Sequence, residues 1–498
     1  DWPALESVIG PGADVAAAQH AAWFADLAVS SLEIELETTT LQATDAAVTY
    51  LVEVGVGDAG LWRYRSEVAL IPAGDGWLVD WVPSALHPSL GTGDHFEVSH
   101  RWSDRAPIVD VAGRALVADE PEVIVGIIPG RVESRDTLAA EFQTHLGISP
   151  STIDSLLDAP GVQPDWYVPV TRVDRPSYVT IRPLLYPIPG VAFRVESQRV
   201  PAFGTLGTEL IGTTGEITAE LLDVLGPPYS AGLVVGRSGM ERAFETVLAG
   251  TPTVDVVRRS PDGDDVVVHG FPGAAGETVT AGLEVEAQYV AESIVADAAL
   301  PTAIVAIDIA TGEVRAAASS PAGGFNEALS GLYPPGSTFK TVVATAALEA
   351  GIQRSDVVAC PETVTVSGKV FANAASLPSS LTLEQAFARS CNTAFIELGT
   401  SLEPGALLDV AARYGFDVEY TIGVASAGGR FEPSGDAVNY AASMIGQGRV
   451  LASPLHMASV AATVAAGAWR VPSLIAGGDG EAVGTFDTAV MADMRAMM

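Results

Sequence analysis

Residues 331–351 constrain the fold most, because a loop rich in helix breakers runs straight into an apolar, alanine-rich segment. The loop contains the run Pro-Pro-Gly at 334–336, which prevents a helix from starting earlier. Gly351 stands where glycine commonly ends a helix. The pattern therefore predicts a buried helix over about residues 337–350, with a loop leading into it.

Ser337 opens this predicted helix, and Lys340 lies on the same face one turn further on. A serine hydroxyl is a poor nucleophile at neutral pH unless a nearby unprotonated base takes its proton. Apolar neighbours such as Phe339 lower the pKa of a lysine by desolvation. Of the 26 lysine and arginine residues only Lys340 and Lys369 are lysines, and arginine cannot act as a base. The pair indicates a nucleophile beside its base, although Ser-x-x-Lys alone arises by chance in about one such chain in seven.

Composition narrows the class of protein. The length of 498 residues suggests about three domains, and 48% hydrophobic with 17% charged residues is typical of globular chains. The net charge of −35 argues against binding to nucleic acids or to anionic membranes, and it indicates an acidic, solvated surface. The histidines and cysteines show no metal-ligand spacing, so we expect no metal and no cofactor.

The two cysteines and the first residues bear on the cellular compartment. In an exported protein Cys360 and Cys391 would form one disulfide, joining the segment after the predicted helix to the loop around Cys391, and two free buried thiols are an equal alternative. The chain begins at Asp1 without methionine, and no apolar run is long enough to span a bilayer. We therefore expect an N-terminal export or anchor segment to have been removed.

The N-terminal region combines one helical segment with alternating ones. Apolar residues at helical spacing predict a helix over residues 14–31, which Asp14 caps. Alternation with period two predicts four strands, at residues 31–38, 46–56, 61–70 and 76–83. A helix packed on a curved antiparallel sheet follows. We expect three tryptophans to form its core, Trp77, Trp81 and Trp102.

The two regions that follow differ in pattern. The middle of the chain is rich in proline, glycine and valine, with short predicted strands such as 178–185, and we expect a structural role for it. Beyond it, helices and strands alternate as in α/β folds. Thr382 and Gln385 form a capping box for one helix and Asn392 starts the next, so Ser390 projects from their junction.

Two motifs occur in the order known from one family. Ser337-Thr-Phe-Lys340 is followed 50 residues later by Ser390-Cys-Asn392, which matches the first two of the three motifs of penicillin-binding proteins. Residues 303–314 and 445–458 also fit the sequence order of this family. The chain therefore resembles the class B penicillin-binding proteins, which are D,D-transpeptidases. In domain order it is similar to methicillin-resistance-type and actinobacterial lipoprotein members.

The resemblance implies a multidomain α+β and α/β architecture. It implies a nuclear-transport-factor-like domain with a helix on a curved sheet at 1–104, an elongated mixed dimerisation or pedestal domain at 105–275, and a β-lactamase-like serine transpeptidase domain at 276–498. The third family motif, Lys-Thr-Gly or Lys-Ser-Gly, is absent from these residues. Because a two-stranded hairpin alone makes a poor sheet, we expect this domain to be truncated, with that motif on about 50 to 100 further residues. Taken literally, the chain is then expected to be inactive.

By this resemblance the protein cross-links peptidoglycan stem peptides, and β-lactams acylate it. Ser337 is the nucleophile, Lys340 its base, Ser390 a proton relay and Asn392 a ligand of the substrate amide. The implied partners are stem peptides, β-lactam antibiotics and a glycosyltransferase or another membrane protein of the division or elongation machinery, and the implied location is the extracytoplasmic face of a bacterial cell membrane. A catalytically silent penicillin-binding scaffold or antibiotic sensor is the alternative, and a class D-like β-lactamase is a third possibility.

Overall fold

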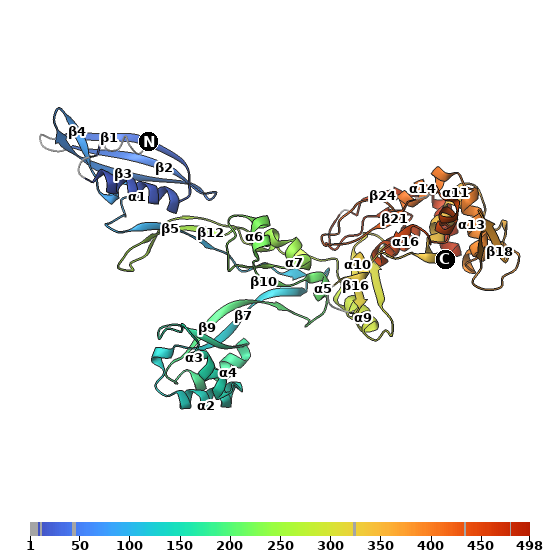
Figure 1. Cartoon of the computed structure of the whole chain (residues 1–498), viewed down its shortest axis with the longest axis horizontal. Coiled ribbons are helices and arrows are strands. Elements are labelled where there is room, and N and C mark those ends of the chain that lie inside the picture. Colours follow the sequence, from blue (N-terminus) through green and yellow to red (C-terminus); the bar gives the residue numbers. More distant parts are fainter. Residues whose placement is uncertain (1–7, 10–11, 42–45, 322–324, 433–434, 479) are drawn as a thin grey trace. The chain divides into compact units, whose positions relative to one another are not determined.

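The computed structural model describes residues 8–9, 12–41, 46–321, 325–432, 435–478 and 480–498 (Figure 1). Its contacts divide the chain into two compact units. The first unit comprises Asp1–Arg105, Leu225–Ser230 and Ala249–Glu277, and the second comprises Ala106–Val224, Ala231–Leu248 and Thr278–Met498. The segment between residues 225 and 277 therefore alternates between the two units.

In the first unit a helix packs on a long antiparallel sheet. Helix α1 (Ala13–Asp26) precedes four strands in the order β1-β2-β3-β4, which are β1 (Val29–Leu41), β2 (Ala46–Val56), β3 (Gly60–Ala73) and β4 (Gly76–Asp80). The predicted strands agree with these, but the predicted helix is too long, because Ala28 takes a left-handed conformation (φ 47°) that turns the chain into β1. Asp14 is not the cap either, since the N-cap is Gly12 and no side chain bonds there.

The fully buried tryptophans of this core are not the predicted ones, although the predicted Trp81 packs against the core. Trp23 on α1 and Trp62 on β3 are buried, whereas Trp77 is 39% exposed and Trp81 and Trp102 are half-buried. Trp77 pairs with Pro72 beside the turn of the β3–β4 hairpin, so part of its ring stays open to solvent. The prediction for Trp77 is wrong because alternation indicates the face of a strand but not how far along the strand the core extends.

Besides the four-stranded sheet, the described residues form two sheets of three or more strands, one in each unit. The first unit has a sheet in the order β13-β12-β5, formed by β5 (His95–Arg101), β12 (Thr253–Arg259) and β13 (Val266–Phe271). The second unit has a sheet around β7 (Ala115–Ile127), which pairs with three strands, β6 (Ile108–Val109), β8 (Val168–Val173) and β9 (Val191–Pro201). Three helices belong to the region around this sheet, α2 (Arg135–Leu146), α3 (Pro150–Leu157) and α4 (Arg175–Leu185).

Helix α4 corrects the prediction of a strand at residues 178–185. Asp174 caps the helix by accepting the backbone N–H of Ser177 at 2.8 Å. Ile181 and Leu185, four positions apart, are both buried, which is the spacing of one helical face. The capping residue Asp174 lies outside residues 178–185, on which the prediction was based.

The C-terminal part of the second unit packs around one buried helix. Helix α11 (Lys340–Glu349) is buried at every position from Lys340 to Leu348, and the single turn η4 (Gly336–Phe339) precedes it. Its helical neighbours include α13 (Asn392–Ser401), α14 (Pro404–Arg413) and α17 (Thr488–Met497). Outside this group, α9 (Val285–Ala296) packs on the hairpin of β15 (Thr302–Ile307) and β16 (Val314–Ser320). The predicted buried helix is therefore present, with its first turn wound as a 3₁₀ helix.

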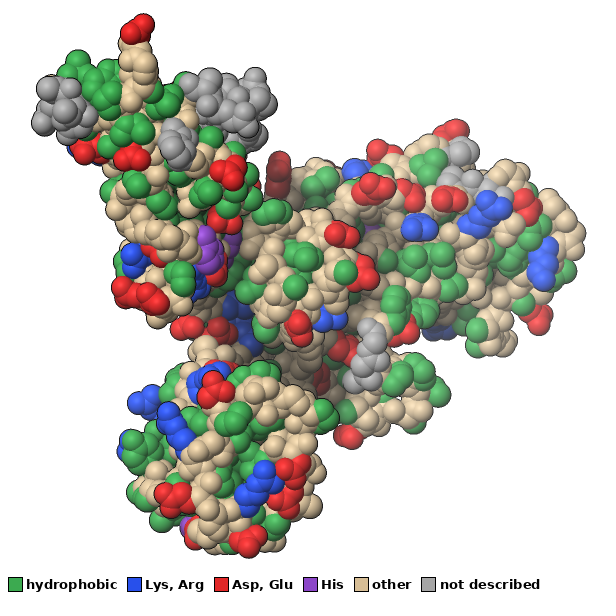
Figure 2. Space-filling model, turned by 60° about the vertical axis from the view of Figure 1, so that its left-hand side comes forward, with side chains coloured by type: hydrophobic (Ala, Val, Ile, Leu, Met, Phe, Trp, Pro, Cys, Tyr) green, Lys and Arg blue, Asp and Glu red, His purple; other side chains and the backbone are tan. Residues whose placement is uncertain are grey.

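The surface carries the acidic character of the sequence. Figure 2 shows acidic side chains spread over the visible face among hydrophobic and polar ones. Within the described ranges, no helix has the length and apolar character needed to cross a membrane. In the same ranges no group of histidine, cysteine and acidic side chains could hold a metal ion.

Candidate active site

Ser337 lies exposed on η4, directly in front of the buried helix α11. The turn is held by a second segment, because the backbone N–H of Gly336 donates to the carbonyl oxygen of Gly446 at 2.9 Å. Gly446 has φ of 67°, and a Cβ atom there would lie 1.9 Å from the Gly336 carbonyl oxygen. Glycine is therefore required at 446, where two backbones approach each other beside Ser337.

The amine of Lys340 lies among four oxygen atoms. Its Nζ is 3.1 Å from Ser337 Oγ, 2.8 Å from Ser390 Oγ, 2.9 Å from the Ser390 carbonyl oxygen and 2.7 Å from Asn392 Oδ1. The side chain is 1% exposed, and this burial lowers the pKa of Lys340 to about 8. All four neighbouring oxygens are uncharged acceptors, so no carboxylate contact opposes the effect of burial.

Ser390 and Asn392 come from the junction between α12 (Leu383–Ala388) and α13. The predicted capping box of Thr382 and Gln385 starts α12. Ser390 takes a left-handed conformation with φ of 56°, and its hydroxyl donates to Ser337 Oγ at 2.8 Å. The amide of Asn392 donates to the carbonyl oxygen of Ala372 at 3.1 Å. The junction thus places a hydroxyl and an amide on either side of the lysine amine.

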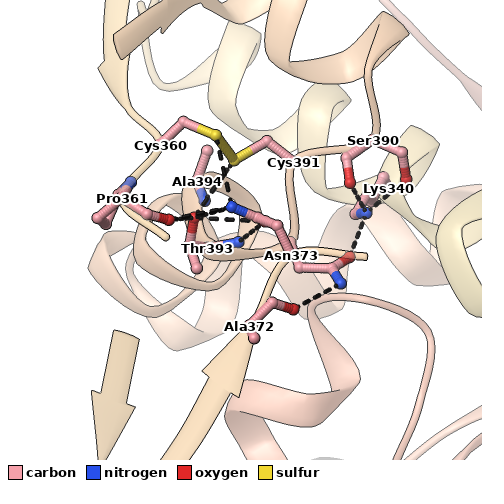
Figure 3. Close-up of a disulfide and its surroundings, with 10 residues drawn as sticks. Lys340, Cys360, Pro361, Ala372, Asn373, Ser390, Cys391, Thr393 and Ala394 are labelled. Carbon is pink, nitrogen blue, oxygen red and sulfur yellow. Dashed lines mark hydrogen bonds between the residues drawn. A yellow bond between two sulfur atoms is a disulfide. The ribbon is translucent and has the colours of Figure 1, made fainter. Parts of the chain in front are cut away.

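A disulfide connects this junction to the segment around residue 360. Cys391, between Ser390 and Asn392, is bonded to Cys360, so of the two alternatives left open by the sequence the structure has the disulfide (Figure 3). The side chain of Asn373 donates to the Pro361 carbonyl oxygen at 3.0 Å and accepts the backbone N–H of Thr393 at 3.2 Å. Figure 3 shows Lys340 directed toward Ser390 beside this network.

A cavity of about 340 Å³ adjoins three of the four side chains, those of Ser337, Lys340 and Ser390. It is lined by Ser337, Thr338, Lys340, Thr341, Phe387, Ser390, Met457, Val460, Ala461 and Met498. Its walls are mainly apolar, and two serines and a lysine contribute to them. Two larger hollows, of about 630 and 420 Å³, belong to the first unit and contain none of these residues.

The structure brings together all four residues that the sequence singled out. Lys369 stays outside the group, because it is exposed at the start of β19 (Lys369–Ala372). Sequence reasoning missed Asn373 and gave Gly446 no role. The Gly-Gln-Gly run at 446–448 was a usable signal for a close backbone approach, whereas nothing local distinguishes Asn373 from other surface asparagines.

Three family models match consecutive parts of the chain. The NTF2-like N-terminal transpeptidase domain matches residues 15–94, the penicillin-binding protein dimerisation domain matches residues 101–281, and the penicillin-binding protein transpeptidase domain matches residues 302–495. The chain is a class B penicillin-binding protein. The last matched range contains both the Ser337 and the Ser390 motifs.

Named relatives of this penicillin-binding protein match parts of it. Peptidoglycan D,D-transpeptidase PbpA of Mycolicibacterium smegmatis is 40% identical over 147 residues, which is 28% of this chain and 30% of the relative. Penicillin-binding protein 3 of Bacillus subtilis is 23% identical over 77% of this chain and 62% of its own length. Peptidoglycan D,D-transpeptidase FtsI of Escherichia coli is 25% identical over 56% and 48%. The matches thus span about a third to three fifths of these relatives.

Proposed function

We propose that this penicillin-binding protein is a D,D-transpeptidase that cross-links peptidoglycan stem peptides through an acyl-enzyme on Ser337, and that β-lactams acylate the same serine. The observation that carries the proposal is the simultaneous contact of the Lys340 amine with Ser337, Ser390 and Asn392. The relatives named peptidoglycan D,D-transpeptidases support the class of substrate.

In the first step Ser337 Oγ attacks the carbonyl carbon between the two terminal D-alanines, and its proton passes to the neutral Lys340 amine 3.1 Å away. With a pKa of about 8, roughly a tenth of the lysine is neutral at pH 7. The backbone N–H of Ser337 lies at the N-terminal end of the helical turn. It is therefore suited to donate to the oxygen that becomes negatively charged.

In the second step the C–N bond breaks and the leaving D-alanine amine takes a proton. Ser390 Oγ supplies it, because this hydroxyl lies 2.8 Å from both Lys340 Nζ and Ser337 Oγ and can be reprotonated by the lysine. Asn392 orients the substrate amide. The amine of a second stem peptide then attacks the ester carbonyl carbon and loses a proton to the neutral Lys340 amine. The bond from that carbon to Ser337 Oγ breaks and the lysine returns the proton to this oxygen, which completes the cross-link and frees Ser337.

A second candidate is a catalytically silent penicillin-binding scaffold or antibiotic sensor. It is the better reading if the protein as its gene encodes it lacks Lys-Thr-Gly and Lys-Ser-Gly, which do not occur within residues 1–498. Within the described residues, the backbone N–H of Ser337 is the one donor we assign to the oxyanion. A β-lactamase is less consistent with the large N-terminal and middle regions, which deacylation does not need.

The same proposal includes partners and location. We propose stem peptides and β-lactams as ligands, a glycosyltransferase or a membrane protein of the division or elongation machinery as a partner, and the extracytoplasmic face of a bacterial membrane as the location. The disulfide between Cys360 and Cys391 supports an oxidising compartment.

The test is an exchange reaction with the protein as its gene encodes it. A synthetic stem pentapeptide is incubated with a labelled D-amino acid, and the exchanged peptide is measured by mass spectrometry. The proposal expects exchange by the parent and none by Ser337→Ala. Stable penicillin labelling without exchange supports the scaffold, rapid penicillin hydrolysis supports a β-lactamase, and the absence of exchange, labelling and hydrolysis contradicts all three.

A further inference from the structure

Strand β1 forms one edge of the long sheet in the first unit (Figure 1). It pairs with β2 on one side, and no other strand in the described part of the chain pairs with it. Between register shifts at Val29/Ser31 and Leu36/Thr38, residues 31–36 run as a regular strand and are all exposed. The opposite edge differs, because Ile9 bridges to Val79 of β4. Along this six-residue stretch, the N–H and C=O groups of alternate residues do not pair with β2 and are therefore open to pairing.

One face of this edge is apolar. Leu32, Ile34 and Leu36 are 38%, 57% and 70% exposed, and they border a groove of about 420 Å³ on the side of α1. Two polar side chains of the groove are paired locally, since Tyr64 donates to the Leu86 carbonyl oxygen and Trp81 to Gln19, both at 2.7 Å, whereas the buried Nε1 of Trp23 has no partner within the described residues. Side chains that enter this groove beside β1 should therefore be apolar.

The other face of the edge is acidic. Glu33 and Glu35 alternate with the apolar residues, so they project to the opposite side of the sheet. Glu37 is paired with Arg65 at 2.8 Å, and Glu53 on β2 is paired with Arg63. Glu33 and Glu35, in contrast, have no ion pair or hydrogen bond within the described ranges. Two carboxylates beside the open edge of β1 are thus available to pair with basic side chains.

The charges also discriminate against a second copy of this chain. Two β1 strands paired antiparallel about a two-fold axis would place Glu33 and Glu35 of one copy beside those of the other, and like charges opposite each other destabilise a sheet. Edge strands that only resist pairing point a charge toward the apolar side. Here that side carries Leu32, Ile34 and Leu36. The charges of β1 therefore disfavour pairing with a second β1, while the strand remains suited to pair with a basic one.

We propose that β1 accepts an extended segment of a partner protein as a fifth strand, and that this segment alternates apolar residues with lysine or arginine over about six positions. Its apolar side chains enter the groove beside Leu32, Ile34 and Leu36. Its basic side chains lie against Glu33 and Glu35. The free backbone groups of residues 31–36 form the hydrogen bonds to the added strand. The apolar and acidic faces provide the specificity for its alternating sequence.

The test uses the full chain and three synthetic heptapeptides. One alternates lysine and valine, one has the same composition in two blocks, and one alternates glutamate and valine. Affinity is measured by fluorescence anisotropy, and the binding site by hydrogen exchange. The proposal expects the alternating basic peptide to bind at least about tenfold more tightly than either other peptide, and to protect those amides of residues 31–36 that do not already donate to β2.

Charge-matched variants separate this site from general attraction to an acidic protein. Glu33→Lys/Glu35→Lys should lose at least about tenfold in affinity for the basic peptide and gain affinity for the acidic one. Glu67→Lys/Asp80→Lys makes the same charge change on β3 and β4, away from the edge, and should bind like the parent. Ile34→Lys should weaken binding of both alternating peptides.

Three results overturn the proposal. The first is equal binding of the alternating and block peptides, or equal losses in the two double variants, which indicates non-specific charge attraction. The second is protection, in the free chain at low concentration, of those amides of residues 31–36 that do not donate to β2, which means that the edge is already covered. The third is a concentration-dependent dimer that protects β1, which makes a second copy the occupant.

Discussion

At the scale of single residues, we propose that Lys340 carries the proton transfer, and Lys369 provides its control. Lys340 is 1% exposed and contacts Ser337, whereas Lys369 is exposed. We predict that Lys340→Arg lowers the rate of acylation by penicillin by roughly 10³ or more, because a guanidinium stays protonated and cannot accept the Ser337 proton. Lys369→Arg should change the rate by about twofold or less.

Stopped-flow labelling of the gene-encoded protein measures both variants. If Lys340→Arg acylates within about tenfold of the parent, the lysine acts only as a cation and the proton leaves by another route, such as Ser390.

The pH dependence of acylation gives a second prediction for the same amine. Burial lowers the pKa of Lys340 from 10.5 to about 8, and only the neutral amine can act as a base. The acylation rate should therefore rise with pH with a midpoint at about 8, whereas an unburied lysine would give a midpoint near about 10.4. Rates measured from pH 6 to 10 check this prediction, and a midpoint near that of a free lysine argues against the neutral base.

At the scale of structural elements, the disulfide holds the junction that carries Ser390 and Asn392. Cys360 and Cys391 are the two cysteines of the sequence, so a reductant acts on this bond alone. We predict that Cys360→Ser/Cys391→Ser lowers the free energy of unfolding by about 3 to 4 kcal/mol, the value for a cross-link that closes a loop of roughly 30 residues. Acylation should slow by roughly tenfold to a hundredfold, because the two side chains lose their fixed positions.

Urea unfolding and penicillin labelling, each with and without dithiothreitol, test the role of this bond. The double variant is the control for the reductant, since dithiothreitol should change the parent and leave the variant unaltered. A parent that is equally stable and equally active under both conditions shows that the hydrogen bonds around Asn373 hold the junction without the bond.

The elements also show where sequence reasoning succeeds. Helical spacing brings Ser337 and Lys340 together, and a capping box locates the junction of Ser390, so both halves of the site were predictable from local patterns. The pairing of Cys360 with Cys391 stayed open, because it depends on two distant segments meeting. The prediction of a strand at residues 178–185 is wrong because the helix there depends on a cap, Asp174, that lies outside this segment.

At the scale of the whole molecule, the multidomain α+β architecture was predicted and is confirmed. The division at 1–104, 105–275 and 276–498 stays a prediction. What the sequence could not indicate is that β12 pairs with β5, which lies about 150 residues earlier, so that part of the middle region joins the first unit. Partner strands so far apart leave no mark on local alternation.

Stability should depend on pH through His456. Both ring nitrogens are buried without a hydrogen-bond partner within the described ranges, and burial lowers the pKa of His456 from 6.5 to about 3. Because the folded-state pKa lies below the unfolded one, the folded state binds fewer protons, and stability falls as pH drops from about 6.5 toward 3. We predict that this histidine contributes a loss on the order of 4 kcal/mol over that window.

Urea unfolding at several pH values between 7 and 3.5 measures this loss. His456→Leu should be less sensitive to acid than the parent, because the buried ring that resists protonation is gone. His100→Gln changes an exposed ring and should keep the parent's pH dependence. Parallel curves for the parent and His456→Leu would assign the acid sensitivity to other groups.

The central claim is that Ser337 becomes the acylated residue, and intact-protein mass spectrometry after brief exposure to penicillin tests it most directly. The account predicts one adduct per chain on the gene-encoded protein, located by peptide mapping on Ser337 and absent from Ser337→Ala. Circular dichroism should show that this variant keeps the parent fold. An adduct that maps to Ser390 or any other residue, or that persists in Ser337→Ala, contradicts the account.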